Sequence, residues 1–136
     1  MEALGSYRRK QPIVHDIDLF TTGNLADADR EFRNSADVLG KFADGDRRTA
    51  YIVRFEGKNI KVDIFRAPED ERAAAVLHWT GSVQWNIRCR AAAKRRGYKL
   101  NEKGLFTVRT GKRVNAPTEE DILKIIGVTW RPPEER

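Results

Sequence analysis

Two aspartates one residue apart lie in a short stretch where apolar and polar residues alternate. The stretch runs Val14-His15-Asp16-Ile17-Asp18-Leu19-Phe20, and this alternation predicts a β-strand. Because successive side chains of a strand point to opposite faces, Asp16 and Asp18 share one face. Two carboxylates held together repel each other unless a positive charge lies between them, and a divalent cation that prefers oxygen ligands is one solution. A solvated strand edge is the alternative.

A glycine turn with a hydroxyl group and three cations precedes this strand, in the order Gly5-Ser6-Tyr7-Arg8-Arg9-Lys10. Glycine lets the backbone approach a ligand closely, Ser6 can donate a hydrogen bond, and Arg9 can bind an anion through two nitrogen atoms. Such a segment beside an acidic strand can hold a polyphosphate while the acids hold its metal ion. A basic arm that is merely solvated is the alternative.

Two further strand-like runs, 49–55 and 59–65, are separated by Glu56-Gly57-Lys58, which predicts a β-hairpin. The alternation in the second run places Asp63 on the face opposite its isoleucine and valine residues. Asp63 is therefore either a solvent-facing strand residue or a third carboxylate of a metal site. Three carboxylates near a cationic phosphate-binding segment suit two-metal phosphoryl or nucleotidyl transfer.

The rest of the chain carries further helical and strand patterns. Near-helical spacing of five apolar residues predicts a helix over 26–42, namely Ala28, Phe32, Ala36, Val38 and Leu39. Other elements are expected as helices over 69–79 and 83–96 (the second with Ser82 as N-cap), strands over 98–100 and 105–109, and a last helix that Thr118 and Asp121 open with a capping box.

The predicted helix over 83–96 has an apolar side, formed by Val83, Ile87 and Ala91, and a crowded basic side. Closely spaced phosphates would suit the basic side, and a solvated basic face is the alternative. The cations on it are Arg88, Arg90, Lys94, Arg95 and Arg96.

Composition restricts the partners and the chemistry. A net charge of +6 over 136 residues favours a polyanionic partner. Cys89 is the single cysteine, so no disulfide forms within the chain and a reducing compartment is the default. Its arginine neighbours could lower the thiol pKa, although a structural helix cysteine is the simpler interpretation. Two histidines and one cysteine argue against a zinc site, and no apolar stretch is long enough to cross a membrane.

Several motifs continue the order begun by the glycine turn and the acidic strand. They are Lys61-Val62-Asp63-Ile64, Leu77-His78-Trp79-Thr80-Gly81-Ser82, Asn86, Arg90, Leu100-Asn101-Glu102, and a tail from Ile125 to Arg136 with Trp130-Arg131-Pro132-Pro133-Glu134. In order and spacing, over nearly the whole chain, they resemble the palm and thumb of family X DNA polymerases, the group of DNA polymerase β and terminal transferase.

The resemblance implies an α+β fold in two parts. A polymerase-β-like nucleotidyltransferase palm would cover 1–69, with a mixed β-sheet and helices on one face. A small α/β thumb that contacts nucleotide and DNA would cover 70–136. Because the sequence begins four residues before the glycine turn, no lyase or fingers domain is expected.

The resemblance also implies roles for individual residues. Asp16, Asp18 and Asp63 would be catalytic and would bind two Mg²⁺ or Mn²⁺ ions. The residues expected to contact the incoming dNTP are Gly5, Ser6, Arg9, Trp79, Thr80, Gly81, Ser82 and Asn86. Those expected to contact DNA are Lys61, Arg88, Arg90, Lys94, Arg95 and Asn101. The Gly81–Ser82 peptide bond is commonly cis in this family.

Some positions depart from the family pattern. His15 stands where a glycine usually precedes the first acid, and Lys61 and Phe65 stand where arginines are frequent. Val83 replaces a polar residue that often touches the base. His78-Trp79 differs from the Tyr-Phe pair of gap-filling members. Its tryptophan resembles the residue at this position in terminal transferase.

We therefore expect a minimal DNA-directed DNA polymerase that adds deoxynucleotides to a 3′-hydroxyl in short gaps or at broken ends. A template-independent or non-DNA nucleotidyltransferase and a non-catalytic DNA-binding accessory are the alternatives. So small a polymerase would suit a compact viral genome, or a repair complex in which a partner protein contributes DNA binding. A cytoplasmic location in a bacterium or a virus-infected cell is expected, with no membrane partner.

Overall fold

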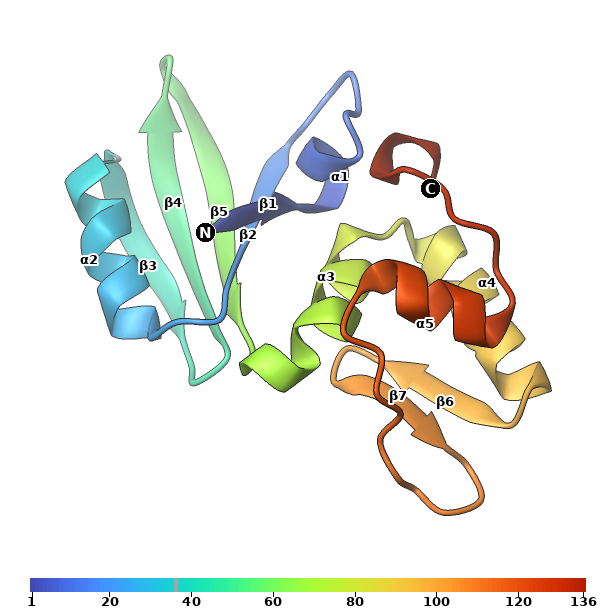
Figure 1. Cartoon of the computed structure of the whole chain (residues 1–136). Helices are drawn as coiled ribbons and strands as arrows, with labels where there is room; N and C mark the ends of the chain where they lie inside the picture. Colours follow the sequence, from blue (N-terminus) through green and yellow to red (C-terminus); the bar gives the residue numbers. More distant parts are fainter. Residues whose placement is uncertain (36) are drawn as a thin grey trace. The chain divides into compact units, whose positions relative to one another are not determined.

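The structure, a computed structural model, describes residues 1–35 and 37–136 and divides into two compact units, Met1–Pro68 and Glu69–Arg136 (Figure 1). Each unit contains both helices and strands, so the predicted α+β class is confirmed. The described helices include none that is long and apolar enough to cross a membrane.

The first unit is built on a five-stranded sheet in the order β1-β2-β5-β4-β3. β2 and β5 are parallel and the other neighbours are antiparallel, so the sheet is mixed, as predicted. Two helices accompany it, α1 (Gly5–Arg8) and α2 (Leu25–Ser35). The strands are β1 (Glu2–Leu4), β2 (Asp16–Thr21), β3 (Val38–Asp44), β4 (Arg48–Phe55) and β5 (Lys58–Arg66).

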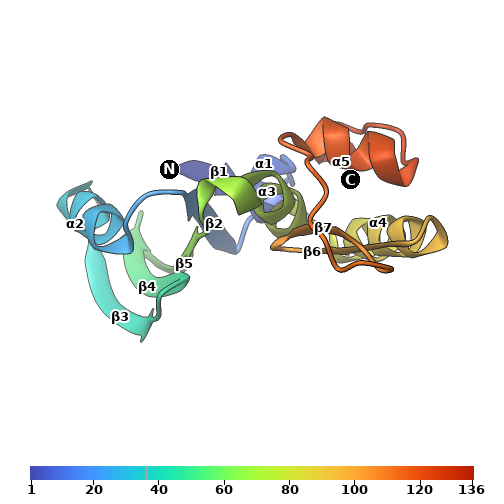
Figure 2. The ribbon, with the colours of Figure 1, turned by 60° about the horizontal axis from the view of Figure 1, so that its bottom comes forward.

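Helix α2 covers one side of the sheet near β3 and β4, as Figure 2 shows. Its Phe32 packs into a core that includes Tyr51 and Ile64. The Tyr51 hydroxyl donates a hydrogen bond to Asp29 of α2, and this bond lowers the pKa of the Asp29 carboxyl. Lys41 Nζ lies 3.4 Å from an Asp29 oxygen, so polar contacts tie the helix to β3 and β4 as well.

The predicted helix over 26–42 is wrong in its second half. Helix α2 ends at Ser35, and Val38 and Leu39 begin strand β3, which pairs with β4; Ala36 lies outside the described residues. Leu39 is 48% exposed, so its near-helical spacing does not reflect burial. The edge of β4 offers backbone hydrogen bonds that local periodicity cannot reveal, and these favour a strand. Neither β1 nor α1 was predicted.

The predicted hairpin between β4 and β5 is confirmed, with a two-residue turn at Glu56-Gly57. Both turn residues have positive φ, 49° and 76°, which fits a tight turn between twisted strands. The turn pairs Phe55 with Lys58 and thereby sets the register of the whole hairpin.

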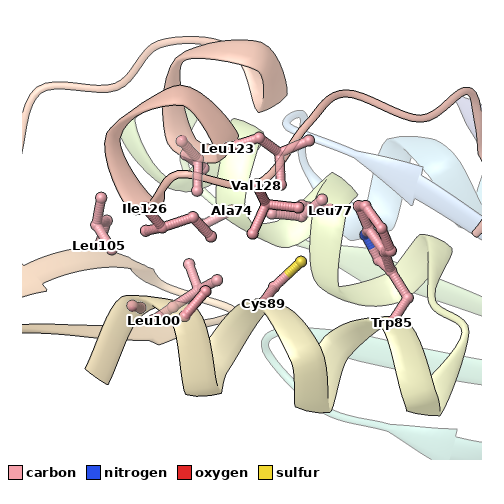
Figure 3. Packing of buried hydrophobic residues seen from close by; sticks show 12 residues of the cluster. Ala74, Leu77, Trp85, Cys89, Leu100, Leu105, Leu123, Ile126 and Val128 are labelled. Carbon is pink, nitrogen blue, oxygen red and sulfur yellow. The ribbon is translucent and has the colours of Figure 1, made fainter. Parts of the chain in front are cut away.

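The second unit packs three helices and a hairpin around one core. Figure 3 shows side chains from α3, α4, α5 and the hairpin converging there, among them Leu77, Cys89, Leu105 and Ile126. The elements are the 3-10 helices η1 (Glu69–Glu71) and η2 (Pro133–Glu135), helices α3 (Arg72–Thr80), α4 (Val83–Arg95) and α5 (Glu119–Ile126), and strands β6 (Tyr98–Asn101) and β7 (Gly104–Thr107).

Both predicted helix caps of this unit are present. Ser82 Oγ accepts a hydrogen bond from the Trp85 backbone N–H at 3.3 Å. Thr118 and Asp121 form the reciprocal capping box that opens α5. The C-terminal tail is also anchored, because the buried Arg136 side chain donates to Glu119 at 2.8 Å and lies over the Trp130 ring.

Helix α4 packs through a different face from the apolar side seen in its sequence. Val83 and Ile87 are 72% and 63% exposed, whereas Trp85 and Cys89 are buried with two alanines of the same helix. Burial raises the pKa of the Cys89 thiol to about 11, against the opposing charges of Arg136 and Arg88. The idea that neighbouring arginines activate this thiol is therefore wrong, and Cys89 is a structural residue.

Candidate active site

The pairing of β2 with β5 brings the three predicted acids to one region of the sheet. In the parallel register Asp16 lies opposite Lys61, and Asp18 lies opposite Asp63. Since Asp16 and Asp18 are two residues apart on a strand, they share a face. The carboxylates come from strands separated by more than forty positions in the sequence, and only the crossover through α2, β3 and β4 makes them neighbours.

Asp63 is buried, so the interpretation of this residue as a solvent-facing strand position is wrong. Two nitrogen atoms of Arg48 donate to the same oxygen, with Nε 2.8 Å and Nη2 2.6 Å from Asp63 Oδ1. Lys61 Nζ lies 3.5 Å from the other oxygen, Oδ2. The carboxylate therefore has a cation at each oxygen atom.

Asp18 is half-buried and lies beside two other carboxylates. Burial raises the pKa of its carboxyl group, and the negative charges of Asp63 and Asp16 raise it further, while Lys61 and Arg48 act in the opposite direction. A raised carboxyl pKa in a cluster of like charges marks a place where an added cation would stabilise the ionised form.

The donor set suits a hard divalent cation, because every candidate ligand is a carboxylate oxygen. Among residues 1–35 and 37–136, however, no three acidic, histidine or cysteine side chains surround one point closely enough to hold a metal ion. Asp63 is instead engaged by Arg48 and Lys61. These residues fit Mg²⁺ or Mn²⁺ in chemistry, and Asp63 would have to exchange at least one cationic partner for the ion.

The glycine turn of the predicted phosphate-binding segment contacts this acidic region. Gly5 follows β1 directly and begins α1 with a φ of 60°, and a Cβ atom added there would overlap the Asp18 carboxylate. Only glycine allows the backbone to pass so close to that acid. Ser6 and Arg9 follow on the same short helix and its cap, and Arg9 Nε is buried without a hydrogen-bond partner among the described residues. An anion could satisfy that donor.

The other predicted nucleotide contacts lie in the second unit, where α3 ends and α4 begins. The Gly81–Ser82 peptide bond is cis, as the resemblance implies. Trp79 is half-buried and meets the His78 ring edge-on with centroids 4.5 Å apart, whereas Thr80 is fully buried.

His78 contacts two residues that were predicted to contact nucleotide or DNA. Arg90 Nη2 lies 2.9 Å from His78 Nδ1, and Asn86 Nδ2 donates to the His78 carbonyl at 2.8 Å. Because an arginine can only donate, His78 Nδ1 is the acceptor and the ring is neutral. Burial lowers the pKa of His78, and the charge of Arg90 lowers it further. Asn101 lines a small pocket together with His78, Asn86 and Arg90.

All five cations on the basic side of α4 are exposed. Four of them, Arg88, Arg90, Lys94 and Arg95, lie within the helix, whereas Arg96 is its C-cap and donates to the Ile125 carbonyl at 3.1 Å. Arg96 therefore has a structural role in joining α4 to α5. Lys61, predicted to contact DNA, lies beside Asp63 in the first unit.

Arg48 is the residue of this region that the sequence analysis did not identify. A usable signal existed, because the two-residue turn at Glu56-Gly57 sets the hairpin register. Counting outward from that turn places Ala50 opposite Asp63 and Arg48 opposite Phe65. An arginine one pleat away on the neighbouring strand is within reach of the acid.

The strand register and the convergent carboxylates define the first unit as a candidate nucleotidyltransferase, and comparison with known proteins identifies the family. Residues 75–136 match the family model of the DNA polymerase beta thumb. The repair DNA polymerase X of African swine fever virus (isolate Tick/Malawi/Lil 20-1/1983) is 32% identical over 138 residues, covering 98% of this chain and 79% of the viral protein.

Bacterial and mammalian relatives match over the same length of this chain. The DNA polymerase/3′-5′ exonuclease PolX of Bacillus subtilis (strain 168) is 32% identical, covering 97% of this chain and 23% of the relative. DNA polymerase lambda of Rattus norvegicus is 29% identical, covering 98% of this chain and 28% of the relative. The chain belongs to the family X DNA polymerases.

Proposed function

We propose that this chain is a minimal repair DNA polymerase that transfers a deoxynucleotide from a dNTP to a DNA 3′-hydroxyl and releases pyrophosphate. The observation that carries the proposal is the register of β2 and β5, which sets Asp18 against Asp63 with Asp16 nearby. The names of the relatives, repair DNA polymerase X among them, support the same activity.

Asp16, Asp18 and Asp63 are the residues that would hold two Mg²⁺ or Mn²⁺ ions. Bound ions of this kind would neutralise the triphosphate and lower the pKa of the attacking hydroxyl group. In this assignment Asp63 would help to deprotonate the 3′-hydroxyl. Its burial keeps its side chain in a defined position. Asp16 is exposed and can reach a ligand in solution.

The segment from Gly5 to Arg9 would bind the triphosphate. Ser6 supplies a hydroxyl donor, and Arg9 carries a buried Nε that has no hydrogen-bond partner among the described residues. In the second unit, Trp79, Thr80 and Gly81 would line the sugar, the buried Thr80 through its backbone. Ser82 would also contact the nucleotide, and Asn86 would contact its base. His78 would keep Arg90 in place beside the templating strand through the contact to its Nδ1.

Primer extension with the purified chain tests the proposal. A labelled primer is offered single-stranded, recessed and at a one-nucleotide gap, with Mg²⁺ or Mn²⁺ and each dNTP separately. We expect template-matched addition on the gapped substrate. Addition regardless of template would indicate a terminal-transferase-like enzyme, and labelled RNA or protein acceptors would reveal a different substrate. No addition on any substrate, with DNA binding retained, would favour a non-catalytic accessory.

DNA binding is expected to be weak and strongly dependent on salt. If Arg88, Arg90, Lys94 and Arg95 each contact one phosphate, a plot of log K against log salt should have a slope of about −3 to −4. Fluorescence anisotropy with gapped DNA between low and physiological salt gives this slope. The double variant Lys94→Ala/Arg95→Ala should reduce its magnitude by about 2.

The matched control for that variant is Arg30→Ala/Arg54→Ala, which removes two exposed arginines from α2 and β4. It should leave the slope close to that of the unmodified chain. A slope near zero, or an equal effect of both double variants, would contradict phosphate contacts by α4.

A further inference from the structure

Arg48 lies next to the acidic residues without belonging to any of the predicted site motifs. It begins β4, directly across from Phe65 in the hairpin register, and its guanidinium carbon lies 6.0 Å from the centre of the Phe65 ring. From there Nε and Nη2 both reach Asp63 Oδ1, at 2.8 Å and 2.6 Å. The two short, charge-assisted hydrogen bonds to one oxygen are closer than the 3.5 Å contact between Lys61 and the other oxygen of Asp63.

The arrangement places two cations among three carboxylates. Three carboxylates, Asp16, Asp18 and Asp63, face two cations, Arg48 and Lys61. The Asp63 side chain is only 7% exposed, so its charge depends on nearby partners rather than on water. The Arg48 side chain is 46% exposed and can therefore turn toward solvent at small cost.

We propose that Arg48 is the counter-ion of Asp63 before a metal ion binds and that it lowers the affinity of the acidic site for divalent ions. An ion that binds Asp63 must take the place of this guanidinium or share the carboxylate with it. Arg48 thus holds the Asp63 carboxylate in place before the ion arrives, and it weakens binding of the ion by charge repulsion. This inference rests on the proposed function, because it takes the three aspartates as the metal-binding residues.

Mn²⁺ binding to the free chain, without DNA or nucleotide, tests the proposal. Electron paramagnetic resonance of unbound Mn²⁺ gives the affinity directly. Arg48→Ala removes one positive charge close to the ion and should tighten binding about tenfold. Arg48→Lys keeps a charge there and should bind nearly as the unmodified chain does.

Arg54→Ala is the matched control, since Arg54 lies on the same strand, six residues away and therefore on the same face, and is exposed. It removes the same charge at a distance from Asp63 and should leave the affinity unchanged. Asp16→Ala should abolish the binding, which locates the ion at the acidic site.

Thermal unfolding provides a second measurement. Without metal ions, Arg48→Ala leaves the buried Asp63 with one cation fewer and should lower Tm by about 4 °C. Saturating Mn²⁺ should remove most of that difference, because the ion replaces the missing charge. A merely structural arginine would lower Tm equally with and without Mn²⁺.

Weaker or unchanged Mn²⁺ affinity in Arg48→Ala would overturn the proposal, as would a chain that binds no Mn²⁺ at all or an Asp16→Ala variant that binds it normally. Neither measurement requires polymerase activity. A chain that shows the expected Mn²⁺ pattern but extends no primer would therefore refute the proposed polymerase function while supporting the role of Arg48.

Discussion

Replacing Asp16 by alanine is expected to reduce nucleotide incorporation roughly 10³-fold or more while the fold stays intact. Asp16 is exposed at the start of β2, opposite Lys61, and no described hydrogen bond of its side chain holds the sheet together. Its carboxylate is therefore free to act on a ligand, and its loss removes one of three oxygen donors from the candidate metal site. Single-turnover extension of a gapped primer measures the rate, and circular dichroism with thermal unfolding checks the fold.

The control for this variant is Asp46→Ala, which removes an exposed aspartate from the turn between β3 and β4. It changes net charge by the same amount and should keep full activity. Asp63→Ala should be as inactive as Asp16→Ala, but less stable, because Asp63 is buried and paired with Arg48. A fully active Asp16→Ala or Asp63→Ala would refute the assignment of the acids.

Replacing Gly5 by alanine is expected to lower incorporation about 100-fold, because the added methyl group displaces the Asp18 carboxylate. The backbone at Gly5 has a φ of 60°, which costs an L-residue about 1–2 kcal/mol, and the new Cβ would overlap the Asp18 carboxylate. We therefore expect a loss of stability as well as of activity. Urea unfolding and single-turnover primer extension measure the two effects.

Gly57→Ala separates the strain of the backbone from the overlap with Asp18. Gly57 also has a positive φ, 76°, but a Cβ added there meets no atom within 4 Å. This variant should lose a similar amount of stability and keep its activity. If Gly5→Ala retained normal activity, the close approach of the glycine turn to Asp18 would have no role in catalysis.

Local patterns were sufficient to predict many elements of this fold. Alternation predicted β2, β4 and β5, and the hairpin between the last two is present with its turn at Glu56-Gly57. The N-cap at Ser82 and the capping box at Thr118 are also present. These features depend on neighbours within a few residues, so short-range physics governs them. The placement of Asp16 and Asp18 on one face follows from the same strand geometry.

Other features depend on partners that are distant in sequence. Strand β3 was mistaken for part of a helix because its hydrogen-bond partner, β4, is not visible in its own spacing. Val83 and Ile87 have helical spacing but are exposed, since Trp85 and Cys89 face the core formed with α3 and α5. Periodicity shows that a helix has an apolar stripe, and only its packing partners decide which stripe is buried.

The sequence by itself determined which residue types are available for the chemistry: three aspartates, a glycine turn with Ser6 and Arg9, and a basic helix. The tertiary structure decided that Asp18 lies opposite Asp63 on two parallel strands and that Arg48 forms an ion pair with Asp63. The physical reason is that parallel strands need a long crossover, so their register, and with it the contact between distant charges, is set by packing of the whole sheet.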